Sequence, residues 1–146
     1  KWNLNAQTTN VPPPANGVRY GLSGDGLFVQ TSGGNEGGMA LAITREYSSG
    51  ISRMWVSPNA VSTLSDVRFT GLMIHEFTHV YQVFNAPYLT MADFLKEAAA
   101  YNVEINYLIR NGAVFDAMNI LNIRNVNGYN WISPEYYSAP QHVWPH

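Results

Sequence analysis

The sequence predicts an α+β protein, because two kinds of hydrophobic periodicity follow one another along the chain. Between Val18 and Ser57, short apolar runs alternate with turn-forming residues, which is typical of antiparallel hairpins. After this stretch, apolar residues recur at the spacing of an α-helix. The chain has 146 residues, of which 46% are hydrophobic, and this is enough for a domain with a buried core.

Four apolar runs make up the predicted small antiparallel sheet. They read VRYGLS, GLFVQT, MALAITREY and ISRMWVS, and Gly-, Asp- and Ser-rich turns separate them. The glycine-rich residues 32–38 lack the lysine of a phosphate-binding loop and precede no helix, so we interpret them as a hairpin connection. Residues 1–17 contain three consecutive prolines and are predicted to be an extended linker or lead-in.

Three helices are predicted after the strands. The first covers about residues 66–84 and ends before an Asn-Ala-Pro turn. Thr90 and Asp93 resemble a capping box, which predicts a second helix from there to residue 110. A third helix is expected over about residues 113–125, and the second and third helices each end at an Asn-Gly pair. The aromatic and proline-rich tail is expected to wrap over the core.

Composition excludes several classes of function. The chain has eight basic and ten acidic residues, a net charge of −2 and no run of basic residues. Neither nucleic acid nor a membrane is therefore expected as a partner. No apolar run approaches the length of a membrane span. Because the chain has no cysteine, histidines and carboxylates must hold any metal. The chain begins at Lys1 without a signal-peptide pattern, so we expect an excised domain or a processed product.

The first predicted helix contains an HExxH motif, formed by His75, Glu76 and His79. Residues four apart on a helix differ by about 40° in direction and about 6 Å in height, so both imidazoles can bind one ion. Glu76 lies about 100° round from His75, beside the open coordination position, where it can take a proton from bound water. Polar groups on such an apolar helix would be unsatisfied without a ligand, which favours a metal site over a chance motif.

A catalytic zinc ion usually has three protein ligands and a water. The third ligand does not follow the pattern HExxHxxGxxH, because Gln82 and Asn85 stand at the positions of its glycine and third histidine. We therefore expect a carboxylate from the second helix, where Asp93, Glu97 and Glu104 are the candidates. Gln82 is expected to make a supporting hydrogen bond or to pack at the helix end.

Glu97 is the preferred third ligand. The three alanines that follow it allow two helices to approach closely, and it lies about two turns past the predicted cap. Glu104 is about 10 Å further along the axis, so we expect it to be a solvated or ion-paired helix position. His142 and His146 in the tail are the remaining alternatives.

The sequence HEFTHVYQ, followed by FLKEAAAYNVE, resembles the gluzincin branch of the HExxH metallopeptidases. More narrowly, it is similar to short zincin-like domains that serve as toxin modules of bacterial polymorphic and type VI secretion effectors, including those fused to VgrG spike proteins. The matching positions are His75, Glu76, Thr78, His79, Val80, Gln82 and Glu97. Tyr81 stands in place of the usual Trp, and the likeness covers about residues 70–105.

This resemblance implies a zincin-like fold within residues 18–146, with the small sheet packed on the HExxH helix and on the ligand helix after it. It implies a zinc endopeptidase that binds Zn²⁺ through His75, His79 and Glu97 and takes its substrate as an added strand along residues 39–57. The implied partners are a protein or peptide substrate and an immunity or inhibitor protein. The implied location is outside the producing cell, either secreted or delivered into a target cell or its periplasm.

Attack on a peptide carbonyl also needs a group that stabilises the oxyanion. Tyr101 lies four residues after Glu97 and shares its helix face. Tyr136, Tyr137 and His142 in the tail are the other candidates.

Two alternatives to an endopeptidase remain. The first is a zinc amidase that acts on cell-wall peptides, because the same site can cleave a different amide. The second is a catalytically inactive, metal-stabilised binding module. In such a module Glu76→Gln changes no activity, whereas loss of His75 or His79 unfolds the domain.

Overall fold

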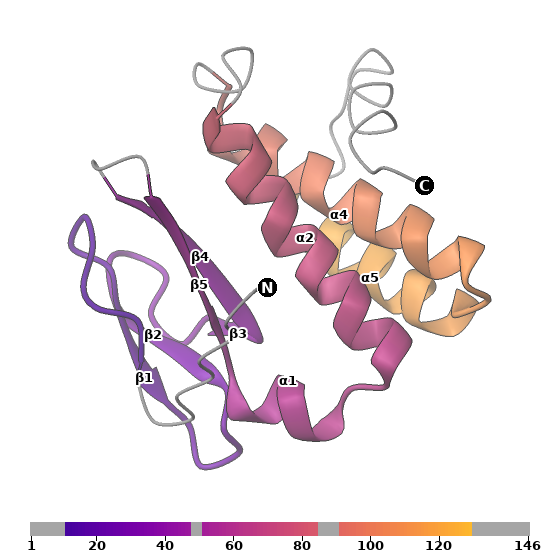
Figure 1. Cartoon of the computed structure of the whole chain (residues 1–146). Helices are drawn as coiled ribbons and strands as arrows, with labels where there is room; N and C mark the ends of the chain where they lie inside the picture. Colours follow the sequence, from indigo (N-terminus) through magenta and orange to yellow (C-terminus); the bar gives the residue numbers. More distant parts are fainter. Residues whose placement is uncertain (1–10, 48–50, 85–90, 130–146) are drawn as a thin grey trace. The chain divides into compact units, whose positions relative to one another are not determined.

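The computed structural model describes residues 11–47, 51–84 and 91–129. Within these ranges, short antiparallel strands precede four helices, so the predicted α+β class is confirmed (Figure 1). The chain divides into two compact units, residues 1–65 and residues 66–146, and each is described by itself. Three expectations stay predictions: the lead-in of residues 1–17, the single domain of residues 18–146, and the packing of a sheet on the helices.

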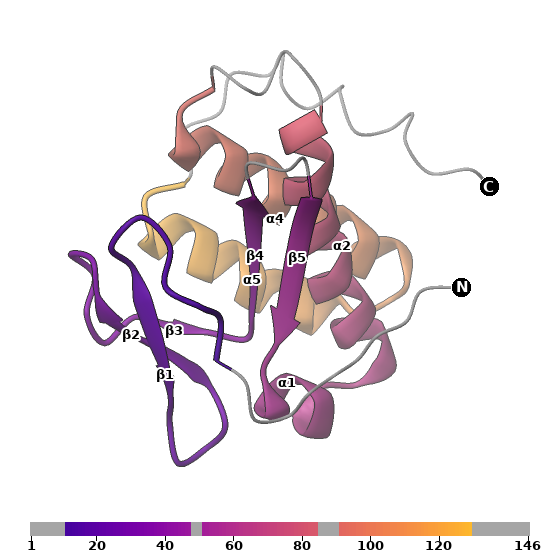
Figure 2. The same cartoon turned by 60° about the vertical axis from the view of Figure 1, so that its left-hand side comes forward.

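The described part of the first unit contains two small antiparallel sheets, where the sequence predicted one. A three-stranded sheet has the order β1 (Arg19–Leu22), β2 (Phe28–Ser32), β3 (Met39–Ala40). Strand β4 (Ala42–Tyr47) pairs with β5 (Ile51–Val56), and Figure 2 shows these two side by side. The run MALAITREY divides at Leu41, because Ala40 pairs with Phe28 whereas Ala42 pairs with Val56. One apolar run therefore serves two sheets, which its residue pattern does not reveal.

A short helix, α1 (Pro58–Thr63), follows β5 and was missed by the sequence analysis. The Ser57 hydroxyl accepts a hydrogen bond from the backbone N–H of Ala60 at 3.2 Å, and a proline begins the helix. The Ser-Pro pair was the signal that could have found it. The N–H of Asn59 donates to the carbonyl of Gly26, which ties α1 to the turn between β1 and β2.

The second unit is helical where it is described. Its helices are α2 (Asp66–Phe84), α4 (Asp93–Arg110) and α5 (Val114–Val126). The first and third agree with the predicted spans to within one residue. The predicted capping box of Thr90 and Asp93 is wrong, because the N-cap residue of α4 is Ala92. The helix begins at Asp93, and its first hydrogen bonds run to the carbonyl of Ala92. Thr90 lies outside the described residues.

Helix α4 packs against both α2 and α5. The three alanines that follow Glu97 are buried, as expected for a helix with neighbours on two sides. Gly71 of α2 faces Leu108 of α4, and a Cβ atom at Gly71 would lie 3.1 Å from a methyl carbon of Leu108 and 3.5 Å from Cγ of Glu104. The missing side chain therefore permits the close approach of α2 and α4.

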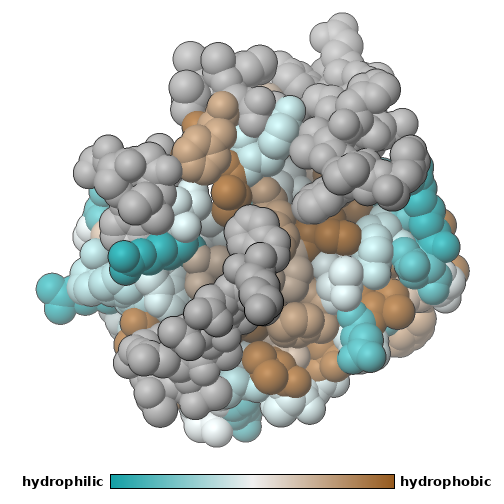
Figure 3. Space-filling view, in the orientation of Figure 1, coloured by the Kyte–Doolittle hydropathy of each residue, from teal (hydrophilic) through white to brown (hydrophobic). Residues whose placement is uncertain are grey.

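Apolar and hydrophilic side chains are interspersed on the face drawn in Figure 3, as expected for a chain with only 12% charged residues. Several large apolar side chains of α5 are exposed, among them Phe115, Met118 and Val126. None of the helices in the described ranges has both the length and the apolar character that a membrane crossing requires.

Replacing Gly71 with valine should lower the free energy of unfolding by about 1–3 kcal/mol, because the added methyl groups meet the buried side chain of Leu108. Urea denaturation measures this change. Thr70→Val, at the exposed neighbouring position of α2, is the matched control and should change the free energy by less than about 0.5 kcal/mol. Equal stability of the two variants would mean that α2 and α4 are not in close contact at Gly71.

Candidate metal centre

Polar residues lie on the facing sides of α2 and α4. On α2, Arg68, His75 and Gln82 are spaced by seven residues, or about two turns, and so share one face. On α4, Glu97 and Glu104 have the same spacing. Arg68 forms an ion pair with Glu104, while Gln82 contacts the backbone near the start of α4. The two helices are therefore antiparallel, with these polar rows against each other.

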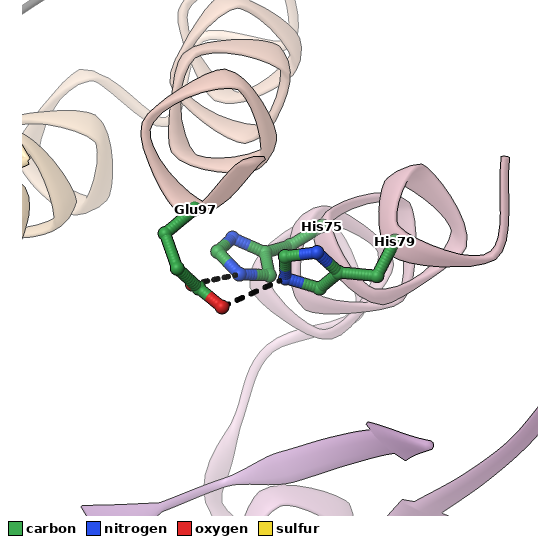
Figure 4. Close-up of side chains that lie close together, drawn as sticks. All are labelled: His75, His79 and Glu97. Carbon is green, nitrogen blue, oxygen red and sulfur yellow. Dashed lines mark ion pairs between the residues drawn. The ribbon is translucent and has the colours of Figure 1, made fainter. Parts of the chain in front are cut away.

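The side chains of His75, His79 and Glu97 point toward one another (Figure 4). Nε2 of His75 is 3.6 Å from Oε2 of Glu97, and Nε2 of His79 is 3.4 Å from Oε1 of the same carboxylate. One ligand atom from each residue lies within 4.8 Å of the others. The structure thus brings together the three residues that the sequence predicted as metal ligands.

These distances suit a shared cation better than direct hydrogen bonds. A charge-assisted N–H···O bond is about 2.7–2.9 Å long. Two ligand atoms of a tetrahedral ion with bonds of about 2.0–2.2 Å are instead separated by about 3.3–3.6 Å. The two histidine–carboxylate distances lie in the second range, each to a different oxygen of Glu97, and the group could hold a divalent metal ion. Asp93 is not a third ligand, because its carboxylate is almost fully exposed and pairs with Lys96.

The Nδ1 atom of each imidazole is bonded to an acceptor. Nδ1 of His75 lies 3.2 Å from Oε2 of Glu104, and Nδ1 of His79 lies 3.0 Å from Oε1 of Gln82. The amide of Gln82 is oriented by a hydrogen bond of 3.0 Å from its Nε2 to the carbonyl of Lys96. Because carboxylate and carbonyl oxygens only accept, each Nδ1 carries a hydrogen and each Nε2 is directed to the site. The predicted supporting bond of Gln82 is confirmed.

Glu104 has a role that the sequence analysis did not predict. Its side chain is 2% exposed, so the expected solvated position is wrong, whereas the expected ion pair is present and is made with Arg68. The axial separation of Glu97 and Glu104 along α4 does not prevent both carboxylates from contacting one histidine. An imidazole presents two nitrogens in different directions, so the ring of His75 contacts both carboxylates.

The charges around His75 favour a cation. Burial lowers the pKa of His75, but the carboxylates of Glu104, Glu97 and Glu76 outweigh this and raise it to about 10. Burial raises the pKa of Glu97, but His75 and His79 outweigh it and hold this pKa well below its ordinary value. The same carboxylates would attract a divalent cation at Nε2 of His75, and that cation would have to displace a proton from this nitrogen.

Glu76, the predicted catalytic residue, is 5% exposed and follows His75 on α2. It is not among the three residues whose ligand atoms gather at the site. Its charge nevertheless acts on both His75 and Tyr101, raising the pKa of each. Glu76 is thus close to the site without being one of its ligands.

Of the predicted oxyanion stabilisers, Tyr101 is the one that lies within the described residues. Its ring meets the ring of His75 edge-on, with centroids 4.5 Å apart. Burial and the charge of Glu97 raise the pKa of Tyr101 above its ordinary value, so its hydroxyl keeps its hydrogen at neutral pH. The other candidates, Tyr136, Tyr137 and His142, and the alternative ligand His146 lie outside the described residues.

Tyr129 is a neighbour of the site that the sequence analysis did not single out. Its ring stacks on Tyr101 with centroids 5.8 Å apart, and its backbone N–H donates to the carbonyl of Arg124 at 3.0 Å. The side chain of Arg124 in turn donates to Asn102 of α4. The only sequence signal was the position of Tyr129 directly after the turn at Gly128, whose φ is +76°.

The chain has no significant match among models of protein families, curated proteins or solved structures. The likeness of its motifs to the gluzincins therefore stays a prediction. What supports the metal centre is the geometry of the residues themselves.

Removing the carboxylate of Glu97 should weaken zinc binding on the order of 100-fold or more, because loss of even an outer partner of a ligand costs about 10–100-fold. Competition with a chromophoric chelator measures the dissociation constant of Glu97→Ala. The matched control is Asp93→Ala, which removes an exposed carboxylate one turn earlier on α4 and should bind zinc like the wild type. Equal affinities of the two variants would rule out Glu97 as a ligand.

Proposed function

We propose that this chain is a zinc-dependent metallopeptidase that cleaves within protein or peptide chains. One observation carries the proposal: Nε2 of His75, Nε2 of His79 and the carboxylate of Glu97 gather at one point, in a chain whose HExxH motif also supplies Glu76. Two imidazoles and one carboxylate leave a coordination position open, and this is the usual ligand set of catalytic zinc.

Zinc in such a site supplies a Lewis acid and lowers the pKa of a coordinated water toward 7. Glu76 accepts a proton from the attacking water and later gives it to the leaving amine. The hydrogen bonds at the Nδ1 atoms of His75 and His79 keep both rings in one orientation. Tyr101, which keeps its hydroxyl hydrogen at neutral pH, donates to the oxyanion of the attacked carbonyl.

The resemblance to bacterial effectors supports a biological setting. In this proposal the chain is the toxin or effector domain of a larger secreted protein and acts in a target cell or its periplasm. Its partners are the protein or peptide that it cleaves and an immunity protein that blocks the site in the producing cell. Cell-wall peptides are an alternative substrate, because a zinc amidase would use the same residues on a different amide.

A catalytically inactive, metal-stabilised module is the alternative from another class of protein. It is favoured by the origin of the ligands, because His75 and His79 belong to α2 and Glu97 belongs to α4. An ion held by all three would cross-link the two helices and contribute to folding. In that case the stability of the second unit depends on the metal, whereas Glu76 has no chemical task.

The variant Glu76→Gln separates these functions. It should retain one zinc per chain but lose about 10²–10⁴-fold in kcat/KM, because the amide cannot accept a proton. Cleavage is measured by mass spectrometry on a library of peptides and on peptidoglycan stem peptides. Asp93→Asn makes the same carboxylate-to-amide change at an exposed position and should be as active as the wild type.

Zinc-loaded wild type that cleaves no amide, or Glu76→Gln with wild-type activity, would overturn the proposed peptidase and favour the inactive module. The same pair of proteins tests the toxin role when each is exported to a bacterial periplasm. The wild type should slow growth and Glu76→Gln should not. Equal growth in the presence of demonstrated peptidase activity would remove the toxin role alone.

A further inference from the structure

Three side chains form a continuous line of polar contacts that starts at the beginning of α2. Nη1 of Arg68 donates to Oε1 of Glu104, and Oε2 of Glu104 accepts from Nδ1 of His75. The line therefore crosses from α2 to α4 and returns to α2 two turns further along. Each oxygen of Glu104 has a different partner, so the carboxylate links the guanidinium of Arg68 to the imidazole of His75.

All three side chains are shielded from solvent. The exposed fractions are 11% for Arg68, 2% for Glu104 and 8% for His75. A carboxylate buried to this extent is costly unless charged or hydrogen-bonded partners compensate it. The aliphatic part of Glu104 packs against α2 at Gly71, where a Cβ atom would lie 3.5 Å from Cγ of Glu104. Apolar packing and the ion pair with Arg68 thus both restrict where this carboxylate can lie.

The position of this carboxylate determines which nitrogen of His75 faces the metal site. While Glu104 accepts from Nδ1, the hydrogen of the neutral ring stays on Nδ1 and the lone pair of Nε2 points toward Glu97 and His79. If the carboxylate moved away, the ring of His75 could rotate or carry its hydrogen on Nε2, and in either case the lone pair of Nε2 would no longer be directed at Glu97. Partners that fix a histidine ligand in this way typically change metal affinity by about 10–100-fold.

We propose that Arg68 is a positioning residue of the metal centre, which acts through Glu104 to hold His75 in its metal-binding orientation. This inference rests on the proposed metal site, to which Arg68 is linked through its ion pair with Glu104. It extends the site to the first turns of α2, seven residues before the HExxH motif.

The test compares Arg68→Met with Arg68→Lys. Methionine keeps much of the length of the side chain but removes its charge and its donors, and it should weaken zinc binding about 10–100-fold. Lysine can still donate one charged hydrogen bond to Glu104 and should restore most of the affinity. Zinc affinity is measured by chelator competition, and cobalt(II) substituted for zinc reports the ligand geometry through its visible spectrum.

The matched control is Arg124→Met. Arg124 also joins two helices of this unit, but its partners are Asn102 and Asn125 and it makes no contact with Glu104. Its loss should leave the zinc affinity and the cobalt spectrum unchanged even if stability falls. Should Arg68→Met fail to fold, Glu104→Gln is the second variant. It should weaken zinc binding, because an amide can donate to Nδ1 of His75 and so place the hydrogen of the neutral ring on Nε2.

The outcomes separate this inference from the proposed function. Zinc binding by Arg68→Met within about twofold of the wild type, or by Glu104→Gln where Arg68→Met does not fold, would refute the role of Arg68 and leave the metal site intact. A wild type that binds no zinc would refute the metal site itself. Equal losses in Arg68→Met and Arg68→Lys, with an unchanged cobalt spectrum, would show only a general effect on stability.

Discussion

Polar groups that are buried between two packed helices need partners, and the arrangement of α2 and α4 meets this need around two histidines. His75, Glu76 and Glu104 are each at most 6% exposed. A buried carboxylate or imidazole lowers stability unless hydrogen bonds or opposite charges compensate it. The Nδ1 atoms of the two histidines have hydrogen-bond partners on the same two helices, whereas the Nε2 atoms face the carboxylate of Glu97. A cation between them would complete this set of interactions.

This arrangement connects helix packing with chemistry. Gly71 and the alanines of α4 allow the helices to approach, and the approach brings Glu97 within 3.6 Å of both histidines. The ligands lie on helices, which hold side chains more rigidly than loops do. If these residues bind an ion, much of the binding geometry is already set by the packing of the two helices. The negative charge around His75 raises its pKa and would also attract a divalent cation, which would have to compete with the proton for Nε2.

The sequence predicted the features that depend on residue spacing within one helix or strand. It did not predict the features that depend on contacts between helices or between strands. The helix of residues 66–84 and the pair His75 and His79 result from a 3.6-residue period. The ligand count required a third ligand, and the alanines that follow Glu97 favoured it over the other carboxylates. The buried role of Glu104 depends on the antiparallel alignment of α2 and α4, which no local pattern encodes. The division of one apolar run between two sheets depends likewise on which strands pair. The short helix at Ser57 is different, because its cap was visible in the sequence and was overlooked.

The most direct test of the account is X-ray absorption at the zinc edge, on protein that carries one zinc per chain after dialysis. The account predicts four or five nitrogen and oxygen ligands at about 2.0–2.2 Å, with outer-shell scattering from two imidazole rings. A shell of six oxygens without imidazole scattering would contradict it, as would protein that retains no zinc. In either case His75, His79 and Glu97 would be no more than a partly buried ion-pair cluster.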